Sequence, residues 1–214
     1  MITLWHCLNA RSFRPLWTLE EMGLAYDLRM LPFPPRAHRK EYLGENVLGT
    51  IPLLVDGATR MTESSIMCHY LGTKYGPTDL VVGVEEPDYG AYLNYVVQGE
   101  ATLTFPQTIV LRYSRLEPPE RRLPQAVEDY GKWFLARLRW VEMQLGDGRE
   151  HLCAGRFTMA DISMGYAIML ADSVGLGEGV PPATRAWWER LRTRSGYHKA
   201  LAAQSHAAAE QGVA

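Results

Sequence analysis

A carboxylate and a hydroxyl stand side by side where a helix is expected to begin. Glu63 and Ser64 precede a series of apolar residues with helical spacing. At a helix N-terminus, the main-chain N–H and the hydroxyl of Ser64 can hold a carboxylate, while the Glu63 carboxylate can accept an ammonium group. The pair is therefore a candidate site for the free α-amino acid end of a ligand. The alternative is an N-cap serine preceded by a solvated glutamate.

A second candidate group is the thiol of Cys7, which ends the first apolar stretch of the chain. Thiol–disulfide exchange needs an exposed sulfur of low pKa near a helix N-terminus. Cys7 is expected at the end of a strand, and residues 7–10 contain no second, resolving cysteine. The position favours a packed residue over a reactive one, and thiol–disulfide exchange is kept as the lesser alternative.

Composition excludes several classes of protein. Lys and Arg total 22 against 24 Asp and Glu, a net charge of −2 without a basic block, so nucleic acid is not an expected partner. The 3 cysteines lie far apart and the 6 histidines form no i, i+4 pair, so no metal site is expected. Without a long apolar run or a basic N-terminal leader, the sequence predicts a cytoplasmic protein with no membrane association.

The first 77 residues alternate between strand and helix patterns. The Asp56-Gly57 pair between two apolar stretches predicts a hairpin, and Gly76-Pro77 closes the last helix. The expected strands are 1–6, 24–31 and the two arms of the hairpin, and the expected helices are 12–22, a short one in 40–46, and one capped by Ser64 or Ser65. A strand, helix and strand in succession predict a parallel pair, and the hairpin adds antiparallel strands.

Beyond a short linker at 78–87, almost all strand signals disappear. Expected helices cover 89–115 with a kink or break at Pro106, then 123–145, 158–173, 182–194 and 196–209. The sequence thus predicts an α/β plus all-α protein, with a mixed-sheet domain over 1–77 and a helical domain over 87–214. Thr158 and Asp161 form a capping box flanked by Phe157 and Ile162 as a hydrophobic staple, which is a structural role.

The order of these motifs resembles the glutathione S-transferase superfamily, which joins a thioredoxin-like half to a helical half. The segments that carry the resemblance are 9–14 (NARSFR), 19–23 (LEEMG), 49–54 (GTIPLL), 62–66 (TESSI) and 157–162 (FTMADI). Each is modest alone, but together they span the chain in the expected order. The resemblance implies glutathione as co-substrate, with its γ-glutamyl end held by Glu63 and Ser64.

The resemblance also implies roles for the loop before the hairpin. It implies a cis bond between Ile51 and Pro52, which turns backbone groups outward to pair with the extended peptide of glutathione. Without the resemblance, a trans proline that opens an edge strand is the better interpretation. His38 and Lys40, beside Arg36 and Arg39, are candidate cations for the glycine carboxylate, although a solvated charge run explains these residues equally well.

The group that activates the thiol is left open between three residues. A thiol of pKa near 8.5 needs a donor and a helix N-terminus to persist as thiolate at neutral pH. Ser12 stands where both can act, although it is also a plain N-cap candidate, and serine-type members of the family often place their serine earlier. Asn9 is the alternative amide donor, and Arg11 can assist electrostatically.

The predicted function is a glutathione-dependent transferase whose thiolate attacks a small, largely apolar electrophile. Conjugation, thioether cleavage, dehalogenation and isomerisation all begin with the same bound thiolate and stay open. Candidate residues for the second-substrate site, for which a packing role is the better interpretation from sequence alone, are Tyr92, Tyr95, Val96, Thr104, Phe105 and Tyr113. The resemblance implies a homodimer with a role in detoxification. A non-catalytic glutathione- or ligand-binding protein on the same fold is the alternative.

Overall fold

The computed structural model describes residues 1–213, which form two compact units. Of the described residues, the first unit comprises Met1–Thr78 together with residues 192–213, and the second comprises Asp79–Leu191. The sequence pattern placed the last helix in the helical domain, whereas in the structure this helix packs with the N-terminal segment.

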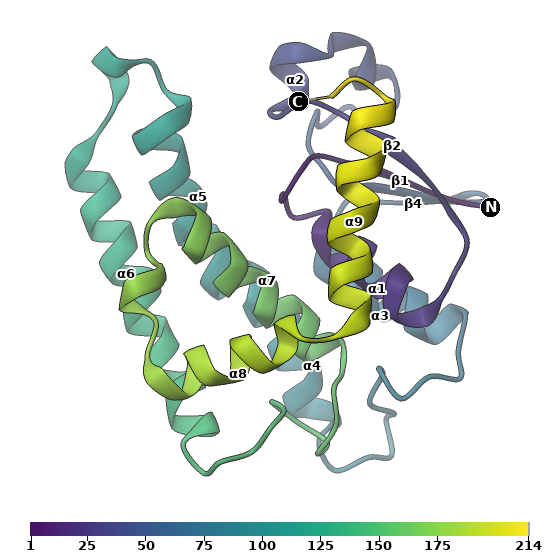
Figure 1. Ribbon diagram of the computed structural model, residues 1–214, viewed down its shortest axis with the longest axis vertical. Coiled ribbons are helices and arrows are strands. Elements are labelled where there is room, and N and C mark those ends of the chain that lie inside the picture. The colour runs from purple at the N-terminus through teal and green to yellow at the C-terminus, as the bar shows by residue number, and fades with distance from the viewer. Residues whose placement is uncertain (214) are drawn as a thin grey trace. The chain divides into compact units, whose positions relative to one another are not determined.

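The first unit has a four-stranded mixed sheet with helices packed against it (Figure 1). Its elements are β1 (Ile2–His6), α1 (Phe13–Met22), β2 (Tyr26–Met30), α2 (Pro35–His38), η1 (Lys40–Gly44), β3 (Leu53–Asp56), β4 (Thr59–Met61), α3 (Ser64–Lys74) and α9 (Ser195–Glu210). The strand order is β2-β1-β3-β4, with β1 and β2 parallel and both other pairs antiparallel. The predicted parallel pair and closing hairpin are therefore both present.

Strand β1 is an interior strand that pairs with β2 and β3, and its residues alternate between buried and half-buried positions. Leu4 pairs with Leu28 of β2 on one side and with Leu54 of β3 on the other. Leu4 and Leu54 have no exposed surface. This register places the end of β1, and the loop that follows it, beside the start of β3.

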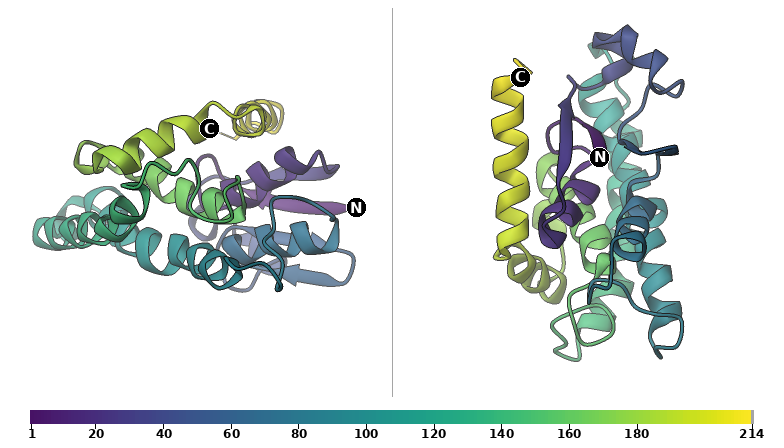
Figure 2. Two further views of the ribbon diagram at one scale, coloured as in Figure 1. Left: turned by 90° about the horizontal axis from the view of Figure 1, so that it is seen from below. Right: turned by 90° about the vertical axis from the view of Figure 1, so that its right-hand side faces the viewer.

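Helix α9 belongs to the first unit through contacts with α1 and β2. In the right-hand view of Figure 2 it runs along the N-terminal segment. The ring of Tyr197 meets Phe13 and Trp17 edge-on, at centroid distances of 5.6 and 5.1 Å. Arg194 forms a two-pronged ion pair with Glu21 at 2.8 and 2.9 Å. The sequence pattern predicted the helix itself but not its partner.

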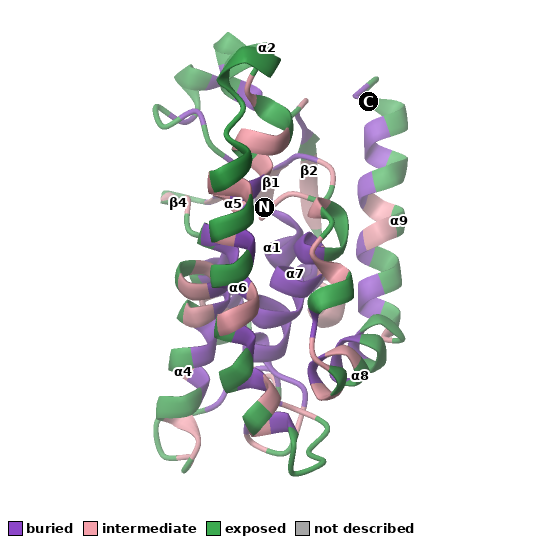
Figure 3. Cartoon of the chain, turned by 90° about the vertical axis from the view of Figure 1, so that its left-hand side faces the viewer, coloured by how far each residue is buried: buried purple, intermediate pink, exposed green. Residues whose placement is uncertain are grey.

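The second unit is helical throughout its regular structure. Its elements are α4 (Tyr89–Gln98), η2 (Gly99–Thr104), α5 (Phe105–Leu111), η3 (Arg112–Leu116), η4 (Pro119–Arg121), α6 (Pro124–Leu145), α7 (Met159–Val174), η5 (Gly177–Gly179) and α8 (Pro182–Arg192). Helix α7 is buried along most of its length, whereas α6 alternates between exposed and buried residues (Figure 3). The predicted helix boundaries in this half agree with the structure to within a few residues.

The helix predicted over 89–115 does not break at Pro106. It passes instead through a π-helical segment, Gly99–Thr104, directly before the α-helical turn that contains the proline. A wider turn at this point accommodates a residue that lacks an N–H donor. Gly99 also packs closely on α7, because an added Cβ would lie 2.4 Å from the Ser163 hydroxyl.

Candidate functional site

The approach to β3 is held by two side chains that bond the same carbonyl. Tyr42 Oη and Asn46 Nδ2 both donate to the Thr50 carbonyl oxygen, at 2.9 and 2.8 Å. The next peptide bond, Ile51-Pro52, is cis, as the resemblance implied. The hydrogen bonds from Tyr42 and Asn46 therefore fix the main chain directly before Ile51 and Pro52, the predicted peptide-binding segment.

Gly49 lies between this segment and the basic loop, which comprises residues 36–40. Its φ of +60° lies in the left-handed region, which favours glycine. A Cβ at this position would lie 2.9 Å from Arg36 Cβ and 3.0 Å from Leu43 Cδ2. Because both backbone conformation and space require glycine, the turn brings the start of the basic loop against the residues that precede β3.

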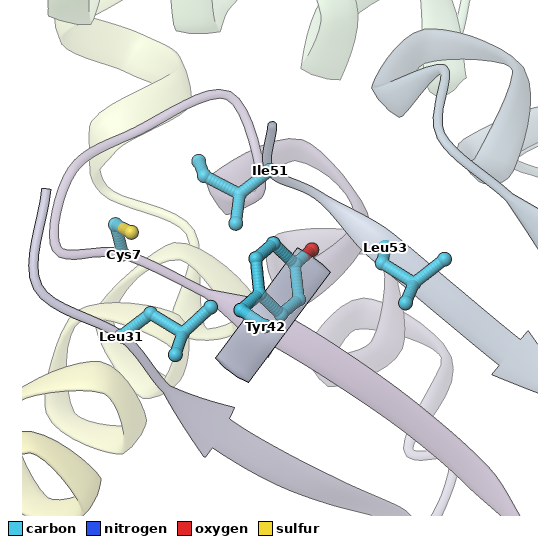
Figure 4. Close-up of a cluster of buried hydrophobic side chains, with 5 residues drawn as sticks. All are labelled: Cys7, Leu31, Tyr42, Ile51 and Leu53. Atoms are coloured by element: carbon cyan, nitrogen blue, oxygen red, sulfur yellow. The ribbon is translucent and has the colours of Figure 1, made fainter. Parts of the chain in front are cut away.

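A small apolar cluster lies beneath these segments (Figure 4). Its buried members are Cys7, Leu31, Tyr42, Ile51 and Leu53. The Cys7 thiol has no exposed surface, donates to the Pro32 carbonyl at 3.7 Å, and has its pKa raised by burial to about 12. A thiol that is covered and protonated lacks both access and nucleophilicity. The structure therefore argues against thiol–disulfide exchange at Cys7 and supports its interpretation as a packed residue.

Helix α3 begins without a side-chain cap. Glu63 occupies the N-cap position, so the prediction that Ser64 or Ser65 caps this helix was wrong. The Glu63 side chain is exposed and makes no capping hydrogen bond. The N–H groups of the first turn carry a partial positive charge and need acceptors, so this end favours an anion next to a free carboxylate.

A buried arginine reinforces the same helix end. Arg14 has no exposed surface, and its Nη1 donates to Ser64 Oγ at 3.0 Å. The bond leaves the Ser64 hydroxyl hydrogen for another acceptor, and the guanidinium adds positive charge behind the helix N-terminus. Arg14 was not among the predicted site residues. Its signal in the sequence is a single charged residue within the otherwise uncharged stretch 13–19 of α1, which the structure buries completely.

Ser12 and Asn9, the two candidate hydrogen-bond donors among the three residues considered for thiol activation, differ in exposure. Ser12 is fully buried, and its hydroxyl accepts a hydrogen bond from the Cys7 N–H at 3.3 Å. It occupies the N-cap position of α1 but forms no side-chain cap. Asn9 is exposed at the turn of the β1–α1 loop, with φ of 55°. Only Asn9 presents its side chain at the surface of the first unit.

The predicted cations lie on exposed backbone of the basic loop. His38 ends α2 and Lys40 begins η1, and both side chains are exposed. Neither forms a hydrogen bond or an ion pair with any residue that the structure describes. Their assignment to a ligand carboxylate stays a prediction.

Two contacts bring the predicted segments together within the first unit. The Arg14–Ser64 bond joins α1 to the start of α3, and the packing of Cys7 on Ile51 joins the end of β1 to the start of β3. These contacts bring together the ends of strands and helices. The candidate residues of the β1–α1 loop, the segment before β3 and the start of α3 therefore lie around one region. His38 and Lys40 share no such contact with the other candidates.

The residues predicted to line a second-substrate site are mostly buried. Phe105 is half exposed and Tyr113 is partly exposed, whereas the other four predicted lining residues, Tyr92, Tyr95, Val96 and Thr104, are buried. The Ser163 hydroxyl of α7 donates to the Val96 carbonyl at 2.7 Å, which is a packing contact between helices. The packing interpretation therefore fits these four residues.

The predicted capping box at the start of α7 is confirmed. The Thr158 N–H donates to Asp161 Oδ2 at 2.9 Å, and the Ala160 N–H donates to Thr158 Oγ1 at 3.3 Å. Asp161 Oδ1 accepts two further bonds, from the Leu152 N–H and from Trp187 Nε1, both at 3.1 Å. A buried carboxylate with its acceptor sites occupied in this way is structural.

Two other classes of site are absent from residues 1–213. No three His, Cys, Asp or Glu side chains in this range are grouped as metal ligands would be. No helix in the same range has both the length and the apolar character needed to cross a membrane.

Comparison with known protein families decides the family. The family described as glutathione S-transferase, N-terminal domain, matches residues 10–74, and the corresponding C-terminal domain family matches residues 124–197. The chain belongs to the glutathione S-transferase superfamily. The N-terminal match begins directly after Asn9, within the β1–α1 loop. It also contains the segment before β3 and the start of α3.

Individual members of the superfamily match nearly the whole chain. Glutathione S-transferase 3 of Zea mays is 27% identical over 205 residues, which cover 92% of this chain and 90% of the relative. A glutathione transferase from Methylococcus capsulatus superposes with a TM-score of 0.82 at 20% identity, covering 96% of this chain and 99% of the other. The glutathione transferase URE2P6 of Phanerochaete chrysosporium, solved with oxidized glutathione, gives 0.81 at 25% identity, covering 96% and 97%.

Proposed function

We propose that this protein is a glutathione-dependent transferase that binds glutathione in its first unit. The observation that carries the proposal is the uncapped start of α3, where an exposed carboxylate at Glu63 adjoins free helix N–H groups and the Arg14–Ser64 pair. A zwitterionic α-amino acid end has one group for each of these features. The complex of URE2P6 with oxidized glutathione supports the same ligand class.

The other contacts follow from the same placement. The γ-glutamyl carboxylate accepts from the first N–H groups of α3 and from the Ser64 hydroxyl, and the ammonium group donates to Glu63. The peptide backbone of glutathione pairs with the main chain at Ile51 and Pro52, and His38 and Lys40 attract the glycine carboxylate. Each contact joins a fixed charge or dipole to its complement, so the tripeptide has one preferred orientation.

The thiol is then held near the β1–α1 loop. Asn9 is the favoured donor to the sulfur because its side chain is exposed, whereas the Ser12 hydroxyl is buried and accepts a main-chain bond. In the conjugation reaction, the thiol proton leaves to solvent and the thiolate forms a carbon–sulfur bond with the electrophile. The leaving group, such as a halide, departs with the electron pair of the broken bond.

The direct test is a calorimetric titration of glutathione against the wild-type protein and the Glu63→Ala/Ser64→Ala double variant. We expect wild-type binding that the double variant loses. Glu85→Ala is the matched control, because Glu85 is an exposed glutamate of the second unit. Thermal unfolding of all three samples separates lost binding from lost structure. Absence of wild-type binding would reject the proposal.

Turnover separates the enzyme from a carrier. The same samples are assayed with a generic aryl halide and glutathione, and we expect conjugation by the wild type and by Glu85→Ala. Binding without turnover of any electrophile tested would favour the alternative, a glutathione-binding protein without catalysis. The burial of the Ser12 hydroxyl is the observation that keeps this alternative open.

The same proposal includes a cytoplasmic homodimer that conjugates apolar electrophiles in detoxification. The basis is membership of the superfamily. Sedimentation equilibrium gives the oligomeric state directly, and a particle of twice the chain mass is expected. A monomer at all concentrations would reject this part without affecting the glutathione site.

A further inference from the structure

Gln204 of α9 joins the far end of the chain to the loop that carries Asn9. The Asn9 N–H donates to Gln204 Oε1 at 3.0 Å, and Gln204 Nε2 donates to Asn9 Oδ1 at 2.7 Å. The two residues are 195 positions apart, and Gln204 is only 3% exposed. One side-chain amide therefore holds both the main chain and the side chain of the candidate thiol-activating residue.

Two bonds identify the oxygen and the nitrogen of the Gln204 amide. The Asn9 N–H can only donate, so the atom it meets on Gln204 is the carbonyl oxygen. The same oxygen lies 2.9 Å from His6 Nε2. Burial lowers the pKa of His6 to about 4, so the ring is neutral at neutral pH and donates through Nε2. The nitrogen end of Gln204 is thereby left to face Asn9 Oδ1.

This arrangement sets the orientation of the Asn9 amide. Asn9 stands at φ of 55°, in the left-handed region, which asparagine adopts more readily than most non-glycine residues when its side chain is hydrogen-bonded. With Oδ1 bound to Gln204, the donor end of the Asn9 amide, Nδ2, lies on the other side of its carboxamide. A sulfur anion accepts hydrogen bonds, so the donor end is the one it requires.

Helix α9 does not depend on Gln204 for its position. At its C-terminal end, Gln211 accepts from the Met30 N–H and donates to the Leu28 carbonyl, both at 2.8 Å. At its other end, the Arg194–Glu21 ion pair and the packing of Tyr197 anchor the helix. Because α9 has these contacts at both ends, the specific effect of the Gln204 bonds is the setting of Asn9.

We propose that Gln204 is a positioning residue of the glutathione site, which holds Asn9 with its amide donor turned toward the thiol and so makes α9 part of the catalytic apparatus. The inference rests on the proposed function, because it assigns Asn9 to the bound thiol. It adds a residue from the C-terminal helix to a site otherwise built from the first 78 residues.

The decisive variant is Gln204→Glu. The new carboxylate still accepts from the Asn9 N–H and from His6, so the main-chain support is kept. It cannot donate to Asn9 Oδ1, and it attracts the Asn9 Nδ2 group instead, which turns the amide oxygen toward the thiol. A purely structural role predicts wild-type behaviour for this variant, whereas a positioning role predicts loss of thiolate stabilisation.

The first readout is the ionisation of bound glutathione, followed by thiolate absorbance against pH. In Gln204→Glu and Gln204→Ala we expect the pKa of the bound thiol to rise by about one unit, and kcat to fall about 10-fold or more at neutral pH. The glutathione Kd is expected to stay within about 2-fold of wild type, because the γ-glutamyl contacts lie elsewhere. Gln211→Ala is the matched control on the same helix, with wild-type thiol pKa and rate expected.

A double-variant cycle tests whether Gln204 acts through Asn9. The Asn9→Ala/Gln204→Ala protein should be no slower than Asn9→Ala alone, since nothing then remains to be positioned. Additive losses, or a wild-type thiol pKa in Gln204→Glu, would overturn the inference while glutathione binding and turnover stand. Absence of wild-type glutathione binding would overturn the proposed function and this inference with it. Thermal unfolding of each variant excludes unfolding as the cause of any loss.

Discussion

Helices α3 and α7 begin in opposite ways. At the start of α7, Thr158 and Asp161 accept the free N–H groups, and the Asp161 carboxylate is buried with four hydrogen bonds (to the Thr158 N–H and hydroxyl, the Leu152 N–H and Trp187 Nε1). At the start of α3, Glu63 points to solvent and no side chain caps the helix. The first arrangement satisfies its polar groups within the protein, and the second leaves them for a ligand.

An acidic residue at the start of a helix can therefore have either of two roles, capping the helix or binding a ligand. Asp161 stands three residues after its N-cap threonine and reaches back to the main chain, whereas Glu63 is itself at the N-cap position and does not. A carboxylate committed to the backbone contributes to stability, and a free one contributes to binding. Substitution should separate these two effects.

The largest expected effect is on the stability of Asp161→Ala. The change leaves the three buried N–H donors of Thr158, Leu152 and Trp187 without an acceptor, so the free energy of unfolding should fall by roughly 3–5 kcal/mol. Denaturant unfolding measures it. Asp147→Ala, at an exposed ion pair with Arg149, is the control and should cost at most about 1 kcal/mol. A loss no larger than that of the control would make the start of α7 as open as that of α3.

The next effect is a dependence of stability on pH that arises in the first unit. His6 of the first unit has its pKa lowered by burial from 6.5 to about 4. Between these values the unfolded chain binds a proton that the folded chain does not, so stability falls as the pH falls from about 6.5 to 4, by up to about 3 kcal/mol.

A variant pair isolates the contribution of this histidine. His6→Gln removes the titrating group, so its unfolding free energy should change less with pH over the same window than that of wild type. His38→Gln, at an exposed histidine, is the control and should follow the wild-type curve. Parallel curves for wild type and His6→Gln would show that the acid sensitivity lies elsewhere.

A smaller free-energy change, confined to binding, is expected at the open helix start. Glu63→Gln keeps the shape of the side chain and removes its charge, so glutathione affinity should fall about 10- to 100-fold through the lost charge-assisted bond. Unfolding free energy should stay within about 0.5 kcal/mol of wild type, since the carboxylate makes no internal bond. Calorimetry and thermal unfolding together give both numbers. A stability loss without a binding loss would identify Glu63 as a cap and remove the contrast with Asp161.

The reactivity of the cysteines should be equally low in both units. Cys7 and Cys68 of the first unit and Cys153 of the second are buried, and burial raises their pKa values to about 12, 11 and 11. The folded protein should resist a mild alkylating reagent at neutral pH, whereas the unfolded chain takes up three groups. Intact mass spectrometry reads the result. Rapid labelling of Cys7 in the folded protein would revive thiol–disulfide exchange.

Many elements of this fold could be predicted because their signals are local. The capping box joins residues three apart, the Asp56-Gly57 turn sits between its own two strands, and the boundaries of α6 lie at Pro124 and Gly146. Superfamily membership followed from the order of such segments. The pattern left a kink or a break open at Pro106. The chain stays helical there through a π-helical segment that packs on α7, a contact between distant residues that the local pattern does not contain.

The candidate site was only partly predictable from sequence. Glu63 and Ser64 stood out by position, and the exposure of Glu63 agrees with a ligand-binding role. The sequence offered both Ser12 and Asn9 as donors to the thiol. The fold buries the Ser12 hydroxyl and exposes the Asn9 amide. Burial depends on which residues of other segments cover a loop, and spacing along one segment carries no such information.

The sequence by itself determined the order of strands and helices, the turns that join them, and the acidic and hydroxyl groups at two helix starts. These follow from backbone preferences and hydrogen bonds between residues close in the chain. Tertiary structure decided what each group does, through Arg14 behind Ser64 and Gln204 behind Asn9, pairs that lie 50 and 195 residues apart. Such pairs form because packing of the apolar faces of α1, α3 and α9 brings distant polar groups together, and burial then makes each of them need a partner.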